Sequence, residues 1–342
     1  MRRSHTAAVL LSTLAALALS ACAADAPTAS TAMPAHPRMA TGTATWIDGV
    51  YNSVYGARYF RVYVPSTYTG TARPMMVMLH GCLQNGYDFD AGTRMSSFAE
   101  TRNFLVLYPE QGTAYNGSDC WNWFYPANQA RGAGEPYVIA GMIDWVKANY
   151  AVDGTRVGVA GFSAGAAMAT IMACTYPDRV RKLAEVAGVM YEGATTAVGG
   201  TNAMLYGSIY DPNGRGTDCW NAMATGGRRV MPTLVFQGTS DGTVNPVNAS
   251  QTAQQWTQTN DLASDGSDND NVDYTADATV TGTTCRSWTQ YDYRNSTNGQ
   301  TVVRKYLISG MDHRWPGGST GGSYTDPCAP DASRIILDFF GF

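Results

Sequence analysis

The pentapeptide Gly161-Phe162-Ser163-Ala164-Gly165 places a serine in the pattern G-x-S-x-G. The small and apolar residues 157–160 before it predict a strand, and the Ala- and Met-rich run 164–174 after it predicts a helix. A tight turn between strand and helix exposes the serine hydroxyl above a sheet, and small flanking residues let the backbone pack closely. The pattern alone is weak in a chain with 36 glycines. In this setting we predict that Ser163 is a nucleophile, the alternative being a plain glycine turn.

A serine hydroxyl needs a base to become nucleophilic, and the chain has 4 histidines. His5 and His36 lie in the N-terminal region, which we expect to be outside the folded part. His80 follows a predicted strand but precedes the serine, whereas His313 follows a later predicted strand. Because a serine at such a turn is followed along the chain first by the acid and then by histidine, we predict His313 as the base. A purely structural His313 would leave Ser163 without one.

The acid of the same constellation is expected between the serine and the histidine, after a strand. Asp241 meets this rule, directly after the predicted strand 233–236. Asp178 lies near a helix end, and Asp211 and Asp218 lie in an irregular stretch, so they fit less well. We expect Asp241 to fix the tautomer of the imidazole and to stabilise the imidazolium.

Two backbone N–H groups are predicted to form an oxyanion hole. One is that of Ala164, directly after the nucleophile, and the other is that of Cys82, in the loop Leu79-His80-Gly81-Cys82 after a predicted strand. Cys82 as a rival nucleophile is disfavoured, because an exported thiol more often forms a disulfide.

Three tryptophans in these loops are candidates for substrate binding: Trp121, Trp123 and Trp315. Their rings are suited to line a cleft for an apolar or flat acyl group. The alternative is that they belong to the hydrophobic core.

The elements that must position these side chains alternate along the chain. Predicted strands cover 59–64, 75–79, 104–108, 156–160, 233–236, 286–293 and 301–308, and predicted helices cover 93–102, 136–149, 164–174, 247–258 and 331–340. This alternation predicts an α/β fold with a mostly parallel sheet covered by helices on both faces. Two stretches, the Gly-rich 190–230 and the Asp-rich 261–284, lack periodicity.

The N-terminal residues 1–21 predict a secretion signal, with a basic start followed by an apolar run. Leu19-Ser20-Ala21-Cys22 is similar to a bacterial lipobox, in which the cysteine is lipidated. Cys22 is therefore a candidate lipid anchor, and ordinary cleavage after Ala23 or Ala26 is the alternative. The Ala-, Thr-, Pro- and Ser-rich residues 22–44 predict a flexible tether. We expect an extracellular or periplasmic protein, anchored to the outer membrane if Cys22 is lipidated.

The remaining residues, 45–342, are expected to form one catalytic domain. Setting Cys22 aside, six of the 7 cysteines remain and predict up to three disulfides. Charged residues make up 15% and the formal net charge is −4. This composition excludes a disordered polyelectrolyte, a coiled coil and a basic nucleic-acid binder.

Several segments together resemble the esterase family of poly(3-hydroxybutyrate) depolymerases, which also holds feruloyl and acetylxylan esterases. They are Leu79-His80-Gly81-Cys82, Cys120-Trp121-Asn122-Trp123-Phe124, Arg131-Gly132-Ala133-Gly134-Glu135-Pro136, the turn 161–165 and His313-Arg314-Trp315-Pro316-Gly317-Gly318. The resemblance implies an α/β-hydrolase fold, a triad of Ser163, Asp241 and His313, and no cofactor. Many secreted members append a polymer-binding domain, whereas this sequence ends at Phe342, after its last predicted helix. We therefore expect it to act on soluble or amorphous esters.

The resulting hypothesis is an exported serine esterase with poly(3-hydroxybutyrate) or its oligomers as substrate. A feruloyl or acetylxylan esterase acting on plant polysaccharide is the alternative within the enzymes. A surface lipoprotein that binds a polymer without turnover is the alternative from another class. The expected partner is an ester polymer or oligomer, with no nucleic acid, and membrane contact arises only through an N-terminal lipid anchor.

Overall fold

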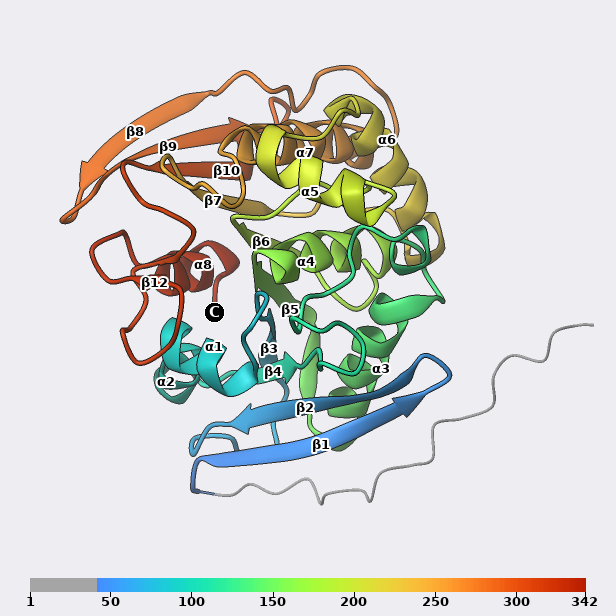
Figure 1. The fold of residues 1–342 in the computed structure, drawn as a ribbon, viewed down its shortest axis with the longest axis vertical. Helices are drawn as coiled ribbons and strands as arrows, with labels where there is room; N and C mark the ends of the chain where they lie inside the picture. Colours follow the sequence, from blue (N-terminus) through green and yellow to red (C-terminus); the bar gives the residue numbers. More distant parts are fainter. Residues whose placement is uncertain (1–41) are drawn as a thin grey trace, which may run out of the picture.

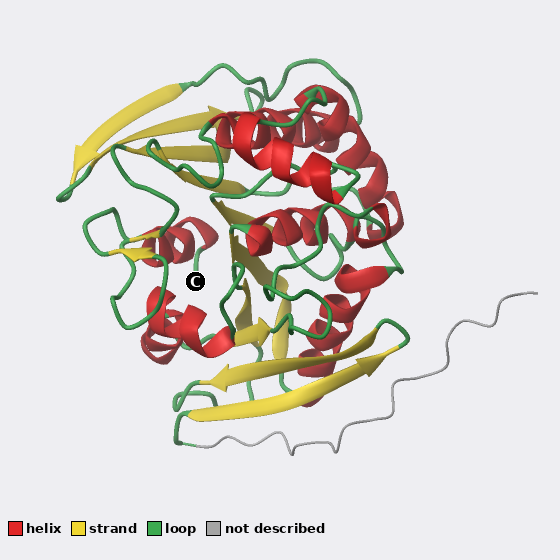
Figure 2. Ribbon diagram, viewed as in Figure 1, coloured by secondary structure: helices red, strands yellow, loops and turns green. Residues whose placement is uncertain are grey.

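One ten-stranded sheet runs through residues 42–342, the part of the chain that the computed structural model describes (Figures 1 and 2). Its six central strands are parallel neighbours: β4 (Leu105–Pro109), β3 (Arg73–Leu79), β5 (Val152–Phe162), β6 (Lys182–Val186), β7 (Thr233–Gly238) and β10 (Thr301–Ile308). Antiparallel strands continue it on both sides, namely β2 (Gly56–Val64) and β1 (Thr45–Ser53), and β9 (Ser287–Arg294) and β8 (Ala278–Thr283). The predicted mostly parallel sheet is confirmed.

Helices cover both faces of this sheet (Figure 1). One face carries α3 (Gly134–Asn149), α4 (Ala164–Thr175), α5 (Ala197–Tyr206), α6 (Pro212–Ala222) and α7 (Val247–Asp265), and the other carries α1 (Gly86–Thr93), α2 (Met95–Arg102) and α8 (Ala332–Phe340). Side chains of β3 alternate between the two cores, with Met75, Val77 and Leu79 in one and Met76 and Met78 in the other. A central strand buried on both faces must therefore be apolar throughout.

The Gly-rich stretch 190–230, for which no helix was predicted, contains α5 and α6. Asp211 accepts a hydrogen bond from the Gly214 N–H and caps α6, and Pro212 occupies its first turn. Gly200 in α5 lies against Phe124, where an added Cβ would come 3.0 Å from the ring-bearing Cβ atom. Packing against Phe124 therefore favours glycine at position 200. This glycine interrupts the apolar periodicity by which a helix would be predicted from the sequence.

Three strands of the ten-stranded sheet also lie outside the predicted set. They are β1, β6 and β8. The apolar run of β6 is short and is interrupted by Glu185, which is completely buried. The stretch 261–284 is only partly irregular, because α7 continues to Asp265 and β8 begins at Ala278.

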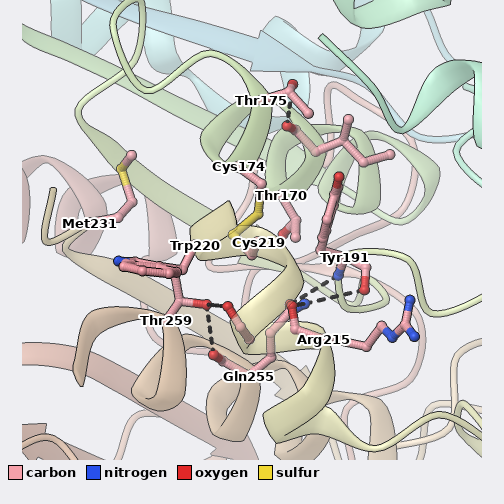
Figure 3. Close-up of a disulfide and its surroundings, with 12 residues drawn as sticks. Thr170, Cys174, Thr175, Tyr191, Arg215, Cys219, Trp220, Met231, Gln255 and Thr259 are labelled. Carbon is pink, nitrogen blue, oxygen red and sulfur yellow. Dashed lines mark hydrogen bonds between the residues drawn. A yellow bond between two sulfur atoms is a disulfide. The ribbon is translucent and has the colours of Figure 1, made fainter. Parts of the chain in front are cut away.

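Three disulfides pair the six cysteines of the described residues: Cys82–Cys120, Cys174–Cys219 and Cys285–Cys328. The prediction of up to three disulfides is confirmed. Figure 3 shows Cys174–Cys219, which joins α4 to α6 beside Gln255 of α7. The predicted signal 1–21, the candidate anchor Cys22 and nearly all of the tether 22–44 lie outside the described residues.

Candidate active site

Ser163 occupies a sharp turn between β5 and α4. Its backbone has φ 55° and ψ −121°, a conformation that non-glycine residues rarely adopt. Two glycines permit the turn, since an added Cβ at Gly161 would lie 2.1 Å from the Gly165 carbonyl oxygen, and one at Gly165 would lie 2.1 Å from the Leu79 oxygen. The strand, turn and helix expected around the serine are all present.

Asp241 and His313 lie together at the carboxyl edge of the sheet, in loops after the neighbouring strands β7 and β10. His313 Nδ1 is 2.8 Å from Asp241 Oδ2. The other carboxylate oxygen, Oδ1, accepts the N–H groups of Thr243 (2.9 Å) and Val244 (2.8 Å). The carboxylate is buried, whereas the His313 side chain is 13% exposed. A proton on Nδ1 directed at Asp241 leaves Nε2 as a base.

The imidazole of His313 lies next to the residue that precedes Ser163. The ring of His313 lies 4.7 Å, centroid to centroid, from the ring of Phe162, the residue before Ser163. Among the described hydrogen bonds, none joins Ser163 Oγ to His313 Nε2. Such bonds are often long in unliganded enzymes and shorten when substrate binds.

His80, the other histidine of the described residues, is a structural residue. It is completely buried, its Nδ1 is 2.8 Å from the Gly81 carbonyl oxygen and its Nε2 accepts the Gln111 N–H at 3.0 Å. Burial lowers the pKa of His80, so the ring is neutral. Both ring nitrogens are occupied, which leaves no lone pair to act as a base.

A cavity of about 120 Å³ opens beside the serine. Its wall is formed by Cys82, Cys120, Trp123, Phe124, Ser163, Ala164, Gly188, Val189, Met204 and Val244. Both predicted oxyanion donors, Cys82 and Ala164, are in this set, and neither backbone N–H has an acceptor within residues 42–342. Ala164 is also the first residue of α4, where the helix dipole favours negative charge.

Of the three candidate tryptophans, only Trp123 lines the cavity. Trp121 is fully buried and its ring lies 5.7 Å from that of His80. Trp315 is 1% exposed, packs edge-to-face on Phe89 and donates its indole N–H to Ser333 Oγ at 3.2 Å. Trp121 and Trp315 therefore belong to the hydrophobic core and do not line the cavity, and substrate binding by Trp123 stays a prediction.

Sequence reasoning missed most of the apolar wall of the cavity. No role in substrate binding was predicted for Phe124, and Met204 reaches the cavity from α5. Val244 follows Asp241, after the same predicted strand, so the signal that pointed to Asp241 could have found it. Val189 follows β6, which lies outside the predicted strands, so no such signal pointed to it.

The segments 120–124 and 131–136, which carry part of the family resemblance, are joined by hydrogen bonds that support the loop with the cavity residues Cys120 and Trp123. Glu135 accepts the backbone N–H of Asn122 (2.8 Å) and its side-chain amide (2.7 Å), and also a hydrogen bond from Gln111. Gln111 in turn donates to the Cys120 carbonyl oxygen at 3.2 Å. Burial raises the pKa of Glu135, although these donors oppose the shift. The network fixes the loop that carries Cys120 and Trp123.

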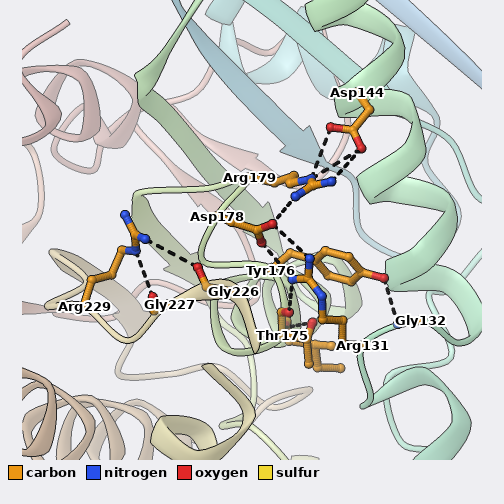
Figure 4. Close-up of polar contacts among 11 residues, drawn as sticks. Arg131, Gly132, Asp144, Thr175, Tyr176, Asp178, Arg179, Gly226, Gly227 and Arg229 are labelled. Carbon is orange, nitrogen blue, oxygen red and sulfur yellow. Dashed lines mark hydrogen bonds and ion pairs between the residues drawn. The ribbon is translucent and has the colours of Figure 1, made fainter. Parts of the chain in front are cut away.

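Arg131 ties the end of this loop region to the end of α4. Its guanidinium donates to both carboxylate oxygens of Asp178 (2.7 and 2.9 Å) and to the Thr175 carbonyl oxygen (2.9 Å), as Figure 4 shows. The geometry is bidentate, the strong arrangement for an arginine and a carboxylate. These contacts are structural and lie away from the residues of the cavity wall.

Glu185 is a buried acid behind the cavity. It is completely buried, and only the hydroxyls of Thr170 (2.9 Å) and Thr252 (3.4 Å) donate to it. Burial raises the pKa of Glu185 to about 8. An added Cβ at Gly188, which lines the cavity, would come 2.3 Å from its Oε1. At neutral pH this carboxyl is therefore protonated and uncharged.

No group of three or more His, Cys, Asp and Glu side chains able to hold a metal ion occurs in residues 42–342. None of the helices in that range combines the length and apolar character needed to cross a membrane.

The chain is similar in sequence and in structure to known esterases. The sequence model of the family described as "Esterase PHB depolymerase" matches residues 58–272. Poly(3-hydroxyalkanoate) depolymerase C of Paucimonas lemoignei is 34% identical over 292 residues, which cover 82% of this chain and 66% of that protein. The chain thus spans just under two thirds of that relative's length. Feruloyl esterase B of Neurospora crassa is 30% identical over 312 residues, 88% of this chain and 94% of that protein.

Among solved structures, an acetyl xylan esterase from Aspergillus awamori is similar, with a TM-score of 0.66 at 19% identity, covering 87% of this chain and 99% of that one. This similarity establishes the α/β-hydrolase fold. The sequence resemblance to the family is confirmed by the matched residues and by the identity to the depolymerase. The chain belongs to the PHB depolymerase family of esterases.

Proposed function

We propose that the protein is an exported serine carboxylic-ester hydrolase that acts on poly(3-hydroxybutyrate) and its oligomers. The observation that carries this proposal is the small apolar cavity lined by Ser163, Cys82 and Ala164. His313, oriented by the buried carboxylate of Asp241, lies against Phe162, the residue before the serine. A nucleophile, a base and donors for an oxyanion are the parts that acyl transfer requires.

In the proposed mechanism, His313 Nε2 takes the proton of the Ser163 hydroxyl as Oγ attacks the ester carbonyl carbon. The tetrahedral oxyanion is held by the N–H groups of Cys82 and Ala164, and Asp241 stabilises the imidazolium. The imidazolium then protonates the leaving alkoxide, which departs as an alcohol and leaves an acyl-serine. A water molecule, deprotonated by the same histidine, repeats the sequence and releases the acid.

The size of the cavity favours a short aliphatic acyl group. It measures about 120 Å³, whereas an apolar cavity of about 150 Å³ holds one benzene molecule. A feruloyl group is larger than benzene, so it would not fit wholly within this volume. This supports a hydroxybutyryl or acetyl group over feruloyl, and it keeps acetylxylan as the second candidate substrate.

The surroundings of the cavity support an apolar polymer. Leu83, Tyr125 and Tyr206 are 66%, 45% and 76% exposed, and they lie one or two residues along the chain from the cavity residues Cys82, Phe124 and Met204. Exposed apolar side chains near a site are suited to contact with a hydrophobic surface.

The proposal also includes the division of the chain into a signal (1–21), a tether (22–44) and a catalytic domain (45–342). Three disulfides support folding in an oxidising compartment. Lipidation at Cys22 is tested by labelling cells with a palmitate analogue and comparing the parent with Cys22→Ala. Label in the parent alone supports the anchor, and label in neither supports ordinary signal cleavage.

The function is tested by clearing of a poly(3-hydroxybutyrate) suspension, run beside acetylated xylan and methyl ferulate. We expect clearing by the parent and loss of all activity in Ser163→Ala, at least about 1,000-fold. Turnover of methyl ferulate alone would contradict the polymer assignment. A serine-reactive phosphonate should form an adduct on Ser163, and its absence from folded protein would favour a non-catalytic binding protein.

A further inference from the structure

Gln237 is a buried polar residue that the proposed mechanism does not use. It is fully buried at the carboxyl end of β7, four residues before Asp241. Its Nε2 donates to Asp241 Oδ2 at 2.9 Å and to the Val244 carbonyl oxygen at 3.0 Å. Both of these partners are acceptors, so the NH2 end of the carboxamide must face them.

The Asp241 oxygen that Gln237 contacts is the one that faces the histidine. Oδ2 is shared by Gln237 Nε2 and His313 Nδ1, whereas Oδ1 is occupied by two backbone N–H groups. Each carboxylate oxygen thus has two donors. Without the carboxamide, Oδ2 would keep only the imidazole, and the plane of the carboxylate would be less constrained.

The other end of the same carboxamide has no partner. Gln237 Oε1 is buried and accepts no hydrogen bond from the described residues. A buried acceptor left unpaired costs free energy, so packing alone would favour an apolar side chain at this position. The donor end is what distinguishes glutamine from an apolar residue of similar size.

We propose that Gln237 is a positioning residue that holds Asp241 in the orientation required by His313. Through Val244, whose side chain lines the cavity, it also ties the acid to the cavity wall. This inference rests on the proposed serine esterase function and assigns to that site a fourth side chain, which acts through Asp241 and does not touch substrate.

Other ionisable groups near this face of the sheet must be considered in any pH measurement. Val235, two residues before Gln237 on the same face of β7, is in register with Glu185 of β6 and with Lys305 of β10. Lys305 donates to Tyr274 OH at 2.8 Å. These groups remain in every variant below, so a change in pH profile relative to the parent belongs to position 237.

The test compares Gln237→Met and Gln237→Glu with the parent on a soluble short-chain ester. Gln237→Met removes the donor at similar volume, and we expect kcat to fall about 10- to 100-fold with little change in KM. In Gln237→Glu, a protonated carboxyl can still donate to Asp241. We therefore expect kcat/KM to be partly retained at acidic pH and to fall as the introduced carboxyl ionises, a limb absent from the parent.

Gln255→Met is the matched control, because Gln255 is also fully buried and its carboxamide bonds only to Tyr191 and Arg215, away from the cavity. We expect it to lower the melting temperature while leaving kcat within about twofold of the parent. If Gln237→Met is folded by circular dichroism and keeps kcat within about twofold of the parent, the proposal is overturned.

A readout that needs no turnover separates this proposal from the proposed function. The His313 Nδ1 proton, hydrogen-bonded to a carboxylate, should give a downfield proton NMR signal in the parent. We expect this signal to shift or broaden in Gln237→Met and to stay unchanged in Gln255→Met. An unchanged signal in Gln237→Met overturns the positioning role, whereas an inactive parent with the expected signal change contradicts only the esterase function.

Discussion

Asp241 and Glu185 are two buried carboxyls on adjacent strands or their loops, and their hydrogen-bond partners differ. Asp241 accepts from two backbone N–H groups and a carboxamide, and its Oδ2 also faces the imidazole of His313. Glu185 accepts only from two threonine hydroxyls, and burial raises its pKa to about 8. The comparison shows how differently two buried carboxyls can be supplied with hydrogen-bond donors. At Glu185 two hydroxyls do not offset the effect of burial, so charge on this carboxyl is disfavoured.

The largest effect is expected from Asp241→Asn, which keeps the shape of the Asp241 side chain but replaces its carboxyl group with a neutral amide. Asparagine cannot accept from all four donors, because its NH2 group would face either the backbone N–H groups or Gln237 and His313. The imidazole should then adopt the wrong tautomer, and we expect kcat to fall about 10,000-fold. Kinetics on a soluble ester measure this, with circular dichroism as the folding control. A loss below about tenfold would show that Asp241 is not the acid.

The protonation of Glu185 is tested by the free energy of unfolding of the variant Glu185→Gln. The pKa of Glu185 is raised in the folded protein from an ordinary value of 4.5 to about 8, so the folded state binds this proton more tightly than the unfolded state. The free energy of unfolding of the parent should therefore fall as pH rises from about 4.5 to 8, by about 4–5 kcal/mol from this group. Above pH 8 the penalty is fully developed.

Because glutamine does not ionise, the variant should lose this pH dependence. We expect Glu185→Gln to gain stability relative to the parent between pH 5 and pH 9, measured by urea unfolding at both values. Parallel pH dependence in the two proteins would mean that Glu185 ionises as easily when folded as when unfolded.

Removing the two hydroxyls should give the smallest effects, in a fixed order. Thr170 Oγ1 lies 2.9 Å from Glu185 and Thr252 Oγ1 lies 3.4 Å from it. We expect Thr170→Val to lower the free energy of unfolding by about 1 kcal/mol at neutral pH and Thr252→Val by less. Both losses should increase above pH 8, since hydroxyls stabilise the charged form more. The reverse order in denaturant melts would show that these distances do not rank the two bonds.

The positions of Ser163, Asp241 and His313 could be predicted because each follows a strand whose apolar run is legible in the sequence. The carboxyl ends of parallel strands share one edge, so order along the chain was enough to bring Asp241 and His313 together. The proton transfer between Ser163 and His313, and the oxyanion role of Cys82 and Ala164, remain predictions.

Several apolar residues of the cavity wall could not be predicted, and the reasons are physical. Met204 belongs to α5, a helix with two adjacent glycines, of which Gly200 packs against Phe124. Composition alone could not separate Trp123 from Trp121 and Trp315, because an aromatic ring serves a core and a cleft equally well. Glu185 interrupts the apolar run of β6, so this strand was not predicted. The residue type alone does not indicate that burial keeps the carboxyl protonated.

The helix behind the nucleophile has a consequence for directed evolution. All twelve residues of α4 are buried, so this helix has no solvent-facing position where a larger or polar side chain is tolerated. In α5, by contrast, only Gly200 and Ala203 are buried, and Val198 and Tyr206 are 73% and 76% exposed. A library intended to change acyl preference is therefore best placed around Met204, where mutational tolerance and access to the cavity coincide.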